Sequence, residues 1–170
     1  MPPRRTRKLA ALSPILLIAV ASTSAASISL SAMRQEQRER SIAEDAARSL
    51  ADRILSIGRA EIGNPGCWAR RVTESVCEPN ALGTAFDVAG LEPWDGFAHA
   101  GSITFVADET RTDAEIGASM GMPRDLDGDG FASGASVLET ARLLPAVIEI
   151  RWRGIRGEER VVHPFLVVGY

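Results

Sequence analysis

The first third of the chain shows two consecutive hydrophobic patterns, of which the first is an uncharged segment. Residues 9–33 are apolar or small and include no Asp, Glu, Lys or Arg. A helix rises about 1.5 Å per residue, so a helix over these residues is long enough to cross a hydrocarbon layer of about 30 Å. The pattern therefore predicts a membrane-spanning helix over 9–33.

The second pattern, over residues 34–58, has the period of an amphipathic helix. Apolar residues recur at intervals of four, whereas charged residues of alternating sign occupy the opposite face. No Gly or Pro interrupts the region from 16 to 56, and Gly58 is a suitable helix end. We expect one long helix that begins apolar and becomes amphipathic. Alternatively, the capping-box residues Ser41 and Glu44 start a second helix near Ser41.

Short β patterns follow this helix and predict a small antiparallel sheet. Residues 85–88 and 102–106 are brief, but residues 148–153 alternate apolar and charged side chains and reach residues 160–162 through a Gly-bounded turn. Pro164 cannot donate to a sheet ladder, so the last strand is expected to lie at an edge or to end there. These elements predict an α+β fold with a sheet domain over 59–170.

The charge distribution adds an orientation to this arrangement. The 170 residues carry a formal net charge of −3, and all 22 acidic residues follow Met33. Four of the 19 basic residues precede Leu9, which predicts a cytoplasmic leader over 1–8 and an extracytoplasmic body. An acidic body argues against nucleic acid as a partner, because binding to phosphates requires clustered Lys and Arg.

A cleaved secretory signal peptide is the alternative for the N-terminal region. It would consist of the basic residues, an apolar core up to Val20 and a cleavage site of the A-x-A kind ending at Ala21. Cleavage there would release a secreted body and remove most of the apolar helix. The mature N-terminus distinguishes the two interpretations.

Cys67 and Cys77 are the two cysteines of the chain. In an extracytoplasmic protein, two cysteines ten residues apart most simply form a disulfide that closes a short loop. Two buried free thiols are the alternative if the chain is cytosolic. A zinc site is not expected, because two Cys without a nearby His leave a tetrahedral shell incomplete.

An acidic loop carries the most specific motif for a ligand. Asp125, Asp127 and Asp129 alternate along the chain and Gly130 follows them, as in the first half of a calcium-binding loop. The twelfth position of such a loop is Ser136 rather than an acid, with Glu139 three residues later. The sequence thus predicts either a calcium site or a solvated loop of Asx turns.

A G-x-S-x-G motif over residues 117–121 raises a third interpretation, a serine hydrolase. Ser119, Asp125 and His163 follow the chain order of the α/β-hydrolase triad. A nucleophile elbow needs an apolar strand before the Ser and a helix after it, whereas the residues before Ser119 are charged and an acidic loop follows. We therefore expect no catalytic activity.

The combination of these features resembles the type IV pilin-like proteins, and among them the minor pilins and the type II secretion pseudopilins. The resemblance covers nearly the whole chain and rests on the basic leader, the apolar helix that becomes amphipathic, and the closing sheet. The segments that carry it are residues 35–57, 86–91, 101–105, 121–130 and 144–154.

The resemblance implies a structural role and a set of partners. Residues 9–33 would anchor the subunit in the inner membrane, with the N-terminus cytoplasmic, and would form the filament core after assembly with other pilin or pseudopilin subunits. Residues 34–58 would continue this helix into the outward-facing sheet domain. Because some pseudopilins bind calcium in a loop near the sheet, the resemblance also implies calcium at Asp125, Asp127 and Asp129.

Overall fold

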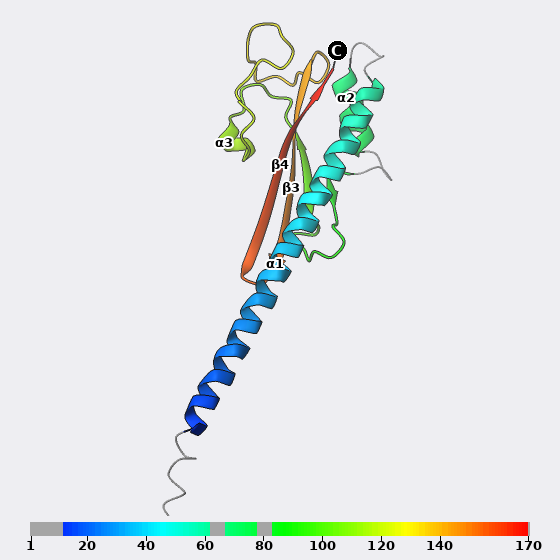
Figure 1. The fold of residues 1–170 in the computed structure, drawn as a ribbon. Coiled ribbons are helices and arrows are strands. Elements are labelled where there is room, and N and C mark those ends of the chain that lie inside the picture. Colours follow the sequence, from blue (N-terminus) through cyan, green and yellow to red (C-terminus); the bar gives the residue numbers. More distant parts are fainter. Residues whose placement is uncertain (1–11, 62–66, 78–82, 170) are drawn as a thin grey trace, which may run out of the picture. The chain divides into compact units, whose positions relative to one another are not determined.

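A computed structural model of the chain describes residues 12–61, 67–77 and 83–169, with the side chains of the first helix described from residue 30 onward. The elements in chain order, drawn in Figure 1, are α1 (Leu12–Glu61), α2 (Trp68–Cys77), β1 (Ala85–Phe86), β2 (Gly101–Phe105), α3 (Asp113–Ile116), β3 (Leu143–Gly154) and β4 (Gly157–Val168). A long helix followed by a small sheet confirms the α+β prediction.

The chain divides into two compact units, Met1–Arg38 and Glu39–Tyr170. The first unit is helical from Leu12, and Leu30 and Met33 are exposed there. Within the described part of the chain, no helix combines the length and the apolar character that a membrane crossing requires. The expected leader over 1–8 lies outside the described residues, as do most side chains of the expected membrane segment over 9–33.

Helix α1 continues without interruption through the capping-box residues Ser41 and Glu44. Arg40 forms an ion pair with Glu44 at 3.0 Å, which is an i,i+4 contact along one helix rather than a helix start. The prediction of one continuous helix is therefore confirmed over the described residues, and the alternative of a break near Ser41 is wrong. The helix ends at Glu61, three residues beyond the expected Gly58.

The four strands form one antiparallel sheet in the order β1-β2-β3-β4. The predicted hairpin is present but longer than expected, because β3 and β4 pair over their full 12-residue lengths up to Gly154 and Gly157. Strand β4 is an edge of the sheet, and it passes through Pro164 without ending. The alternative that the strand lies at an edge is thus the correct one.

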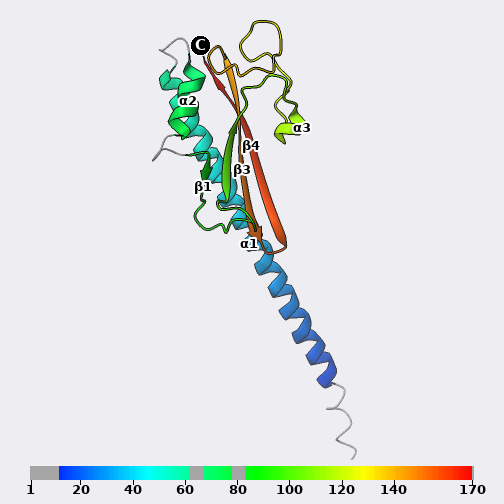
Figure 2. The ribbon, with the colours of Figure 1, turned by 180° about the vertical axis from the view of Figure 1, so that it is seen from behind.

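One face of the sheet in the second unit packs on α1, as both views in Figures 1 and 2 show. Near the hairpin turn, the indole Nε1 of Trp152 donates to Oε2 of Glu39 at 3.3 Å. Near the end of β4, Gly58 lies against Val167, where a side chain on the helix would not fit. The helix therefore follows the β3–β4 hairpin along its length. Its buried residues are Ala43, Ala47, Leu50, Ala51 and Ile54.

The predicted disulfide is absent, and the reason lies in α2. Cys67 and Cys77 are free thiols at the two ends of this helix. At about 1.5 Å per residue, a helix holds residues ten apart at about 15 Å, far beyond the roughly 7 Å limit between disulfide-bonded Cα atoms. Helix α2 forms because its apolar side chains share one buried face, which comprises Trp68, Ala69, Val72 and Val76.

Candidate functional site

The acidic loop is organised around Glu109, a residue that the sequence motif does not include. Among the residues whose burial the structure describes, Glu109 is the one buried charged side chain, with 1% of its surface exposed. Its backbone joins two other segments of the loop: its N–H donates to the Ser133 carbonyl at 3.2 Å, and its carbonyl accepts from the Arg124 N–H at 3.1 Å. Glu109 thus lies where three stretches of the loop meet.

The Glu109 carboxylate accepts three backbone hydrogen bonds from these same stretches. Oε1 accepts from the N–H of Leu126 at 2.5 Å and of Asp127 at 3.2 Å, and Oε2 accepts from the N–H of Ser133 at 2.9 Å. A buried carboxylate requires such compensation, because its transfer out of water is costly without partners. The side chain therefore fixes the positions of residues 126–127 and 133.

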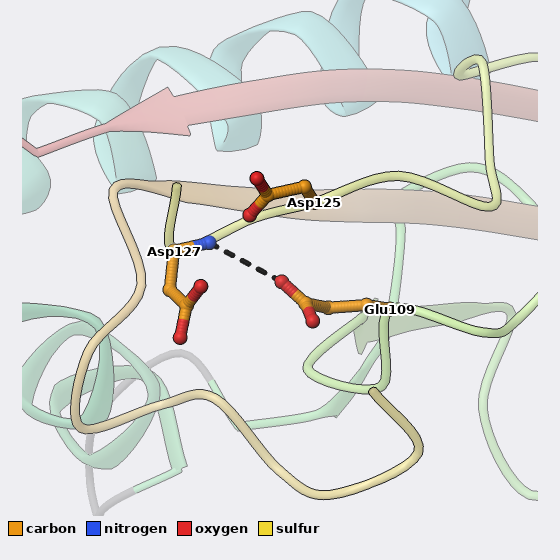
Figure 3. Close-up of side chains that lie close together, drawn as sticks. All are labelled: Glu109, Asp125 and Asp127. Atoms are coloured by element: carbon orange, nitrogen blue, oxygen red, sulfur yellow. Dashed lines mark hydrogen bonds between the residues drawn. The ribbon is translucent and has the colours of Figure 1, made fainter. Parts of the chain in front are cut away.

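Asp125 and Asp127 lie beside Glu109, as Figure 3 shows. One ligand oxygen from each of the three carboxylates can be taken so that all three atoms lie within 4.8 Å of one another. Asp125 also accepts from the backbone N–H groups of Gly130 and Gly128, which hold the pKa of this carboxyl below its ordinary value. The three groups form what we call the carboxylate cluster.

Asp129 does not belong to this cluster, although its spacing predicts it. Its Oδ1 accepts from the backbone N–H of Phe131 at 2.8 Å, as in an Asx turn. It lines a pocket of about 410 Å³ that Asp127 also lines, but the group of carboxylate oxygens within 4.8 Å of one another comes from Glu109, Asp125 and Asp127 and does not include Asp129. The structure therefore brings together two of the three predicted ligands, Asp125 and Asp127, and adds Glu109 to them.

The position of Glu109 has no local signal in the sequence. It precedes its hydrogen-bond partners by 17 to 24 residues, so no spacing rule connects it to them. The one available signal is its place in a segment rich in charge, Asp108 to Glu115, a composition that also argues against an apolar strand before Ser119.

Asp113 performs a similar function for the G-x-S-x-G segment. Its carboxylate accepts from the backbone N–H groups of Met122 at 2.8 Å, Met120 at 3.0 Å and Gly121 at 3.1 Å. These bonds hold the pKa of Asp113 below its ordinary value, with the bond from Met122 as the largest cause. Gly117 is the left-handed C-cap of α3. The motif is thus explained by turn geometry.

The predicted hydrolase residues are distributed over separate parts of the second unit. Ser119 follows the short helix α3, Asp125 belongs to the carboxylate cluster, and His163 lies on β4 where its ring neighbours Phe165. Among the residues that the structure describes, no hydrogen bond joins any two of the three. A nucleophile elbow places the serine between a strand and a helix. Ser119 instead lies after the short helix α3, and the next described element is the strand β3.

The chemistry that suits the carboxylate cluster is binding of a hard cation. Calcium takes oxygen ligands at about 2.3–2.6 Å, so two ligands on opposite sides of the ion are separated by up to about 5 Å. The separation in the cluster falls within this limit. Three neighbouring carboxylates also repel one another, and a divalent cation would relieve that repulsion. The residues present therefore fit calcium.

No protein-family model, no curated protein and no solved structure matches this chain.

Proposed function

We propose that this chain is a pilin-like structural subunit, anchored in the inner membrane by residues 9–33 and assembled through that helix with other pilin or pseudopilin subunits. The observation that carries the proposal is the continuity of α1. A single helix from Leu12 to Glu61 begins in the uncharged segment and ends in the core of the sheet unit. A cleaved signal peptide needs no such continuity, because its apolar segment is discarded.

The second half of α1 supports a structural role for the helix in the body itself. Ala43, Ala47 and Ile54 are completely buried against the sheet unit. The body therefore depends on residues that are contiguous with the proposed anchor. Cleavage after Ala21 would leave this packing in place, but it would remove the anchor.

The anchor can be tested by determining the N-terminal residue and the membrane partition of the protein from its own cells. We expect an N-terminus at or before Ala11, in the membrane fraction or in sheared filaments. Leu17→Arg should reduce membrane recovery, because a charge at the centre of a spanning helix costs about 2.5–3.5 kcal/mol on insertion scales. Leu17→Ile is the matched control and should behave as wild type.

The contradicting result is a soluble protein that begins at Ser22. It would replace the proposal by its alternative, a secreted calcium-stabilised binding domain. An ester-cleaving activity that is lost in Ser119→Ala would instead support the hydrolase interpretation.

Independently of the anchor, we propose that calcium binds the carboxylate cluster and stabilises the acidic loop. The supporting observation is the proximity of Glu109, Asp125 and Asp127, whose carboxylate oxygens can be chosen so that all three lie within 4.8 Å of one another. Glu109 and Asp127 each supply a carboxylate to the cluster, and the backbone N–H of Asp127 also donates to Glu109. A cation bound here would therefore hold together stretches of the loop that are distant in sequence.

Calcium at 100 times its dissociation constant should raise the free energy of unfolding by about 2.7 kcal/mol. Asp127→Asn should abolish most of this rise, because it removes a member of the cluster. Asp129→Asn is the matched control, since Asp129 lies outside the cluster, and it should retain the rise. The measurement is thermal unfolding of the full chain with calcium and with chelator. Loss of the rise in Asp129→Asn but not in Asp127→Asn would contradict the site.

A further inference from the structure

A groove of about 280 Å³ lies between α1 and the edge strand β4 in the second unit. Four consecutive residues of β4, from Arg160 to His163, form one side of the groove. Arg40, Glu44 and Arg48, which follow one another at intervals of one helical turn on α1, form the other side. The groove is thus bounded by a helix and by the open edge of a sheet.

Within the part of the chain that the structure describes, no strand pairs with the outer edge of β4, so its backbone presents hydrogen-bonding groups along this groove. In an antiparallel sheet, the N–H and C=O groups of successive residues point alternately to the two sides. The N–H of Arg151 donates to the Ala100 carbonyl, so odd-numbered residues of β3 point toward β2. Arg151 pairs with Arg160, and Glu149 pairs with Val162. The N–H and C=O groups of Arg160 and Val162 therefore point away from β3, into the open edge.

The position of Pro164 agrees with this assignment. It pairs with Val147 of β3 and so points to the same outer side as Val162. Proline has no N–H to donate, and it is tolerated in a sheet where no ladder bond is required. Pro164 also ends the usable edge, because a further strand would find no donor there. The available stretch of β4 is therefore Glu158 to Val162.

The charge of the groove differs from that of the whole chain. Three arginines and one glutamate line it, whereas the chain has a formal net charge of −3. The ion pairs on the helix side are exposed: Arg40 with Glu44 at 3.0 Å, and Arg48 with Asp45 at 3.4 Å, whereas Arg160 on the strand side is paired with the more buried Glu149. Exposed pairs of this kind contribute about 0–1 kcal/mol each, so an incoming carboxylate can replace them at little cost.

We propose that this groove binds an extended acidic segment of a partner protein. The segment adds to the outer edge of β4 as a fifth strand and directs alternate carboxylates toward Arg40 and Arg48 of α1. Main-chain bonds to Arg160 and Val162 supply sequence-independent affinity, and the arginines supply the preference for acidic side chains. The groove does not include residues 9–33, so the proposal does not rest on membrane anchoring or filament assembly.

The test is titration of the full chain with a fluorescein-labelled heptapeptide of alternating Glu and Val, blocked at both ends. The matched probe has Lys in place of Glu and should bind at least tenfold more weakly. Arg40→Glu combined with Arg48→Glu should reverse this preference. Arg53→Glu combined with Arg59→Glu is the control for net charge, because it changes the charge by the same four units and neither residue lines this groove.

Strand addition is tested by two substitutions at the edge with opposite expected effects. Val162→Pro removes an outward N–H without removing a bond to β3, and it should weaken binding at least tenfold. Pro164→Ala adds an outward N–H and should leave binding equal or tighter. Circular dichroism checks the fold of each variant. Titration of the wild-type protein should also shift the amide resonances of Arg160 and Val162, and this measurement does not depend on whether a variant folds.

Three results would overturn the proposal. The first is that the acidic peptide and the Lys peptide bind with equal affinity, or that neither peptide binds. The second is that the acidic peptide binds, but Val162→Pro does not weaken its binding and the amide resonances of Arg160 and Val162 do not shift. This result would indicate contact with surface charge rather than strand addition. The third is that sedimentation detects a dimer of the full chain, and that Val162→Pro dissociates this dimer. A second copy of the chain would then be the occupant of the groove.

Discussion

Trp152→Ala should lower the free energy of unfolding by about 3–5 kcal/mol. Trp152 is 1% exposed and lies on the face of β3 that packs on α1. Its indole N–H donates to Glu39, and its backbone bridges to Pro93. Truncation leaves a large cavity between the helix and the sheet, and it leaves Glu39 without this donor. Chemical denaturation of the full chain measures the loss as a lower midpoint.

Trp152→Phe is the control that separates packing from hydrogen bonding. It keeps most of the apolar volume and removes the bond to Glu39, so its cost should be less than half that of the alanine substitution. A free energy of unfolding for Trp152→Ala within 1 kcal/mol of wild type would mean that α1 does not pack on this end of the hairpin.

Glu109→Ala should cost about 3 kcal/mol or more, the second of the large effects. The substitution removes the acceptor for three backbone N–H groups, those of Leu126, Asp127 and Ser133. Each buried donor left unsatisfied costs about 1–3 kcal/mol. The expected result is a lower free energy of unfolding together with faster proteolysis within the loop, because the segments that the side chain holds together become free to separate.

Two variants define the specificity of this effect. Glu109→Gln keeps one carbonyl oxygen as an acceptor but places an amide NH2 group, which donates, where the second oxygen accepts, so its cost should be intermediate. Glu92→Ala removes an exposed carboxylate that pairs with Arg153, and it should change the free energy of unfolding by less than about 1 kcal/mol. Equal costs for Glu109→Ala and Glu92→Ala would refute the assigned role of Glu109.

Local periodicity was sufficient to predict the long helix and the terminal hairpin. The alternation around Ile148 to Arg153 gave the correct strand, and the glycines at 154 and 157 gave the correct turn. The extension of β3 through Pro145 was not predicted, because proline is normally read as a strand breaker. The passage of β4 through Pro164 agrees with one of the two alternatives that the sequence left open, an edge strand. Pro164 lies on the outer edge of the sheet, where its missing N–H has no strand to pair with. Pro145 faces the β2 side and takes part there through its carbonyl, which accepts from the Val106 N–H. These places follow from the register and not from the sequence nearby.

The candidate site was predicted in part, for a comparable reason. The alternation of Asp125 and Asp127 is local and identifies the loop, whereas Glu109 enters through contacts between residues distant in sequence. The spacing of Cys67 and Cys77 was misleading, because a helix lies between them. The apolar residues Ala69, Val72 and Val76 have helical spacing and already indicate this helix.

The parallel course of α1 and the β3–β4 hairpin determines how the body responds to tension. Glu39 contacts Trp152 at the turn, and Gly58 contacts Val167 near the far end, so a pulling force on α1 at residue 39 acts along the interface. Such a load shears all the contacts between helix and sheet at once instead of peeling them apart one after another. We therefore expect the body to resist a load applied at residue 39 better than it would if these contacts separated one at a time.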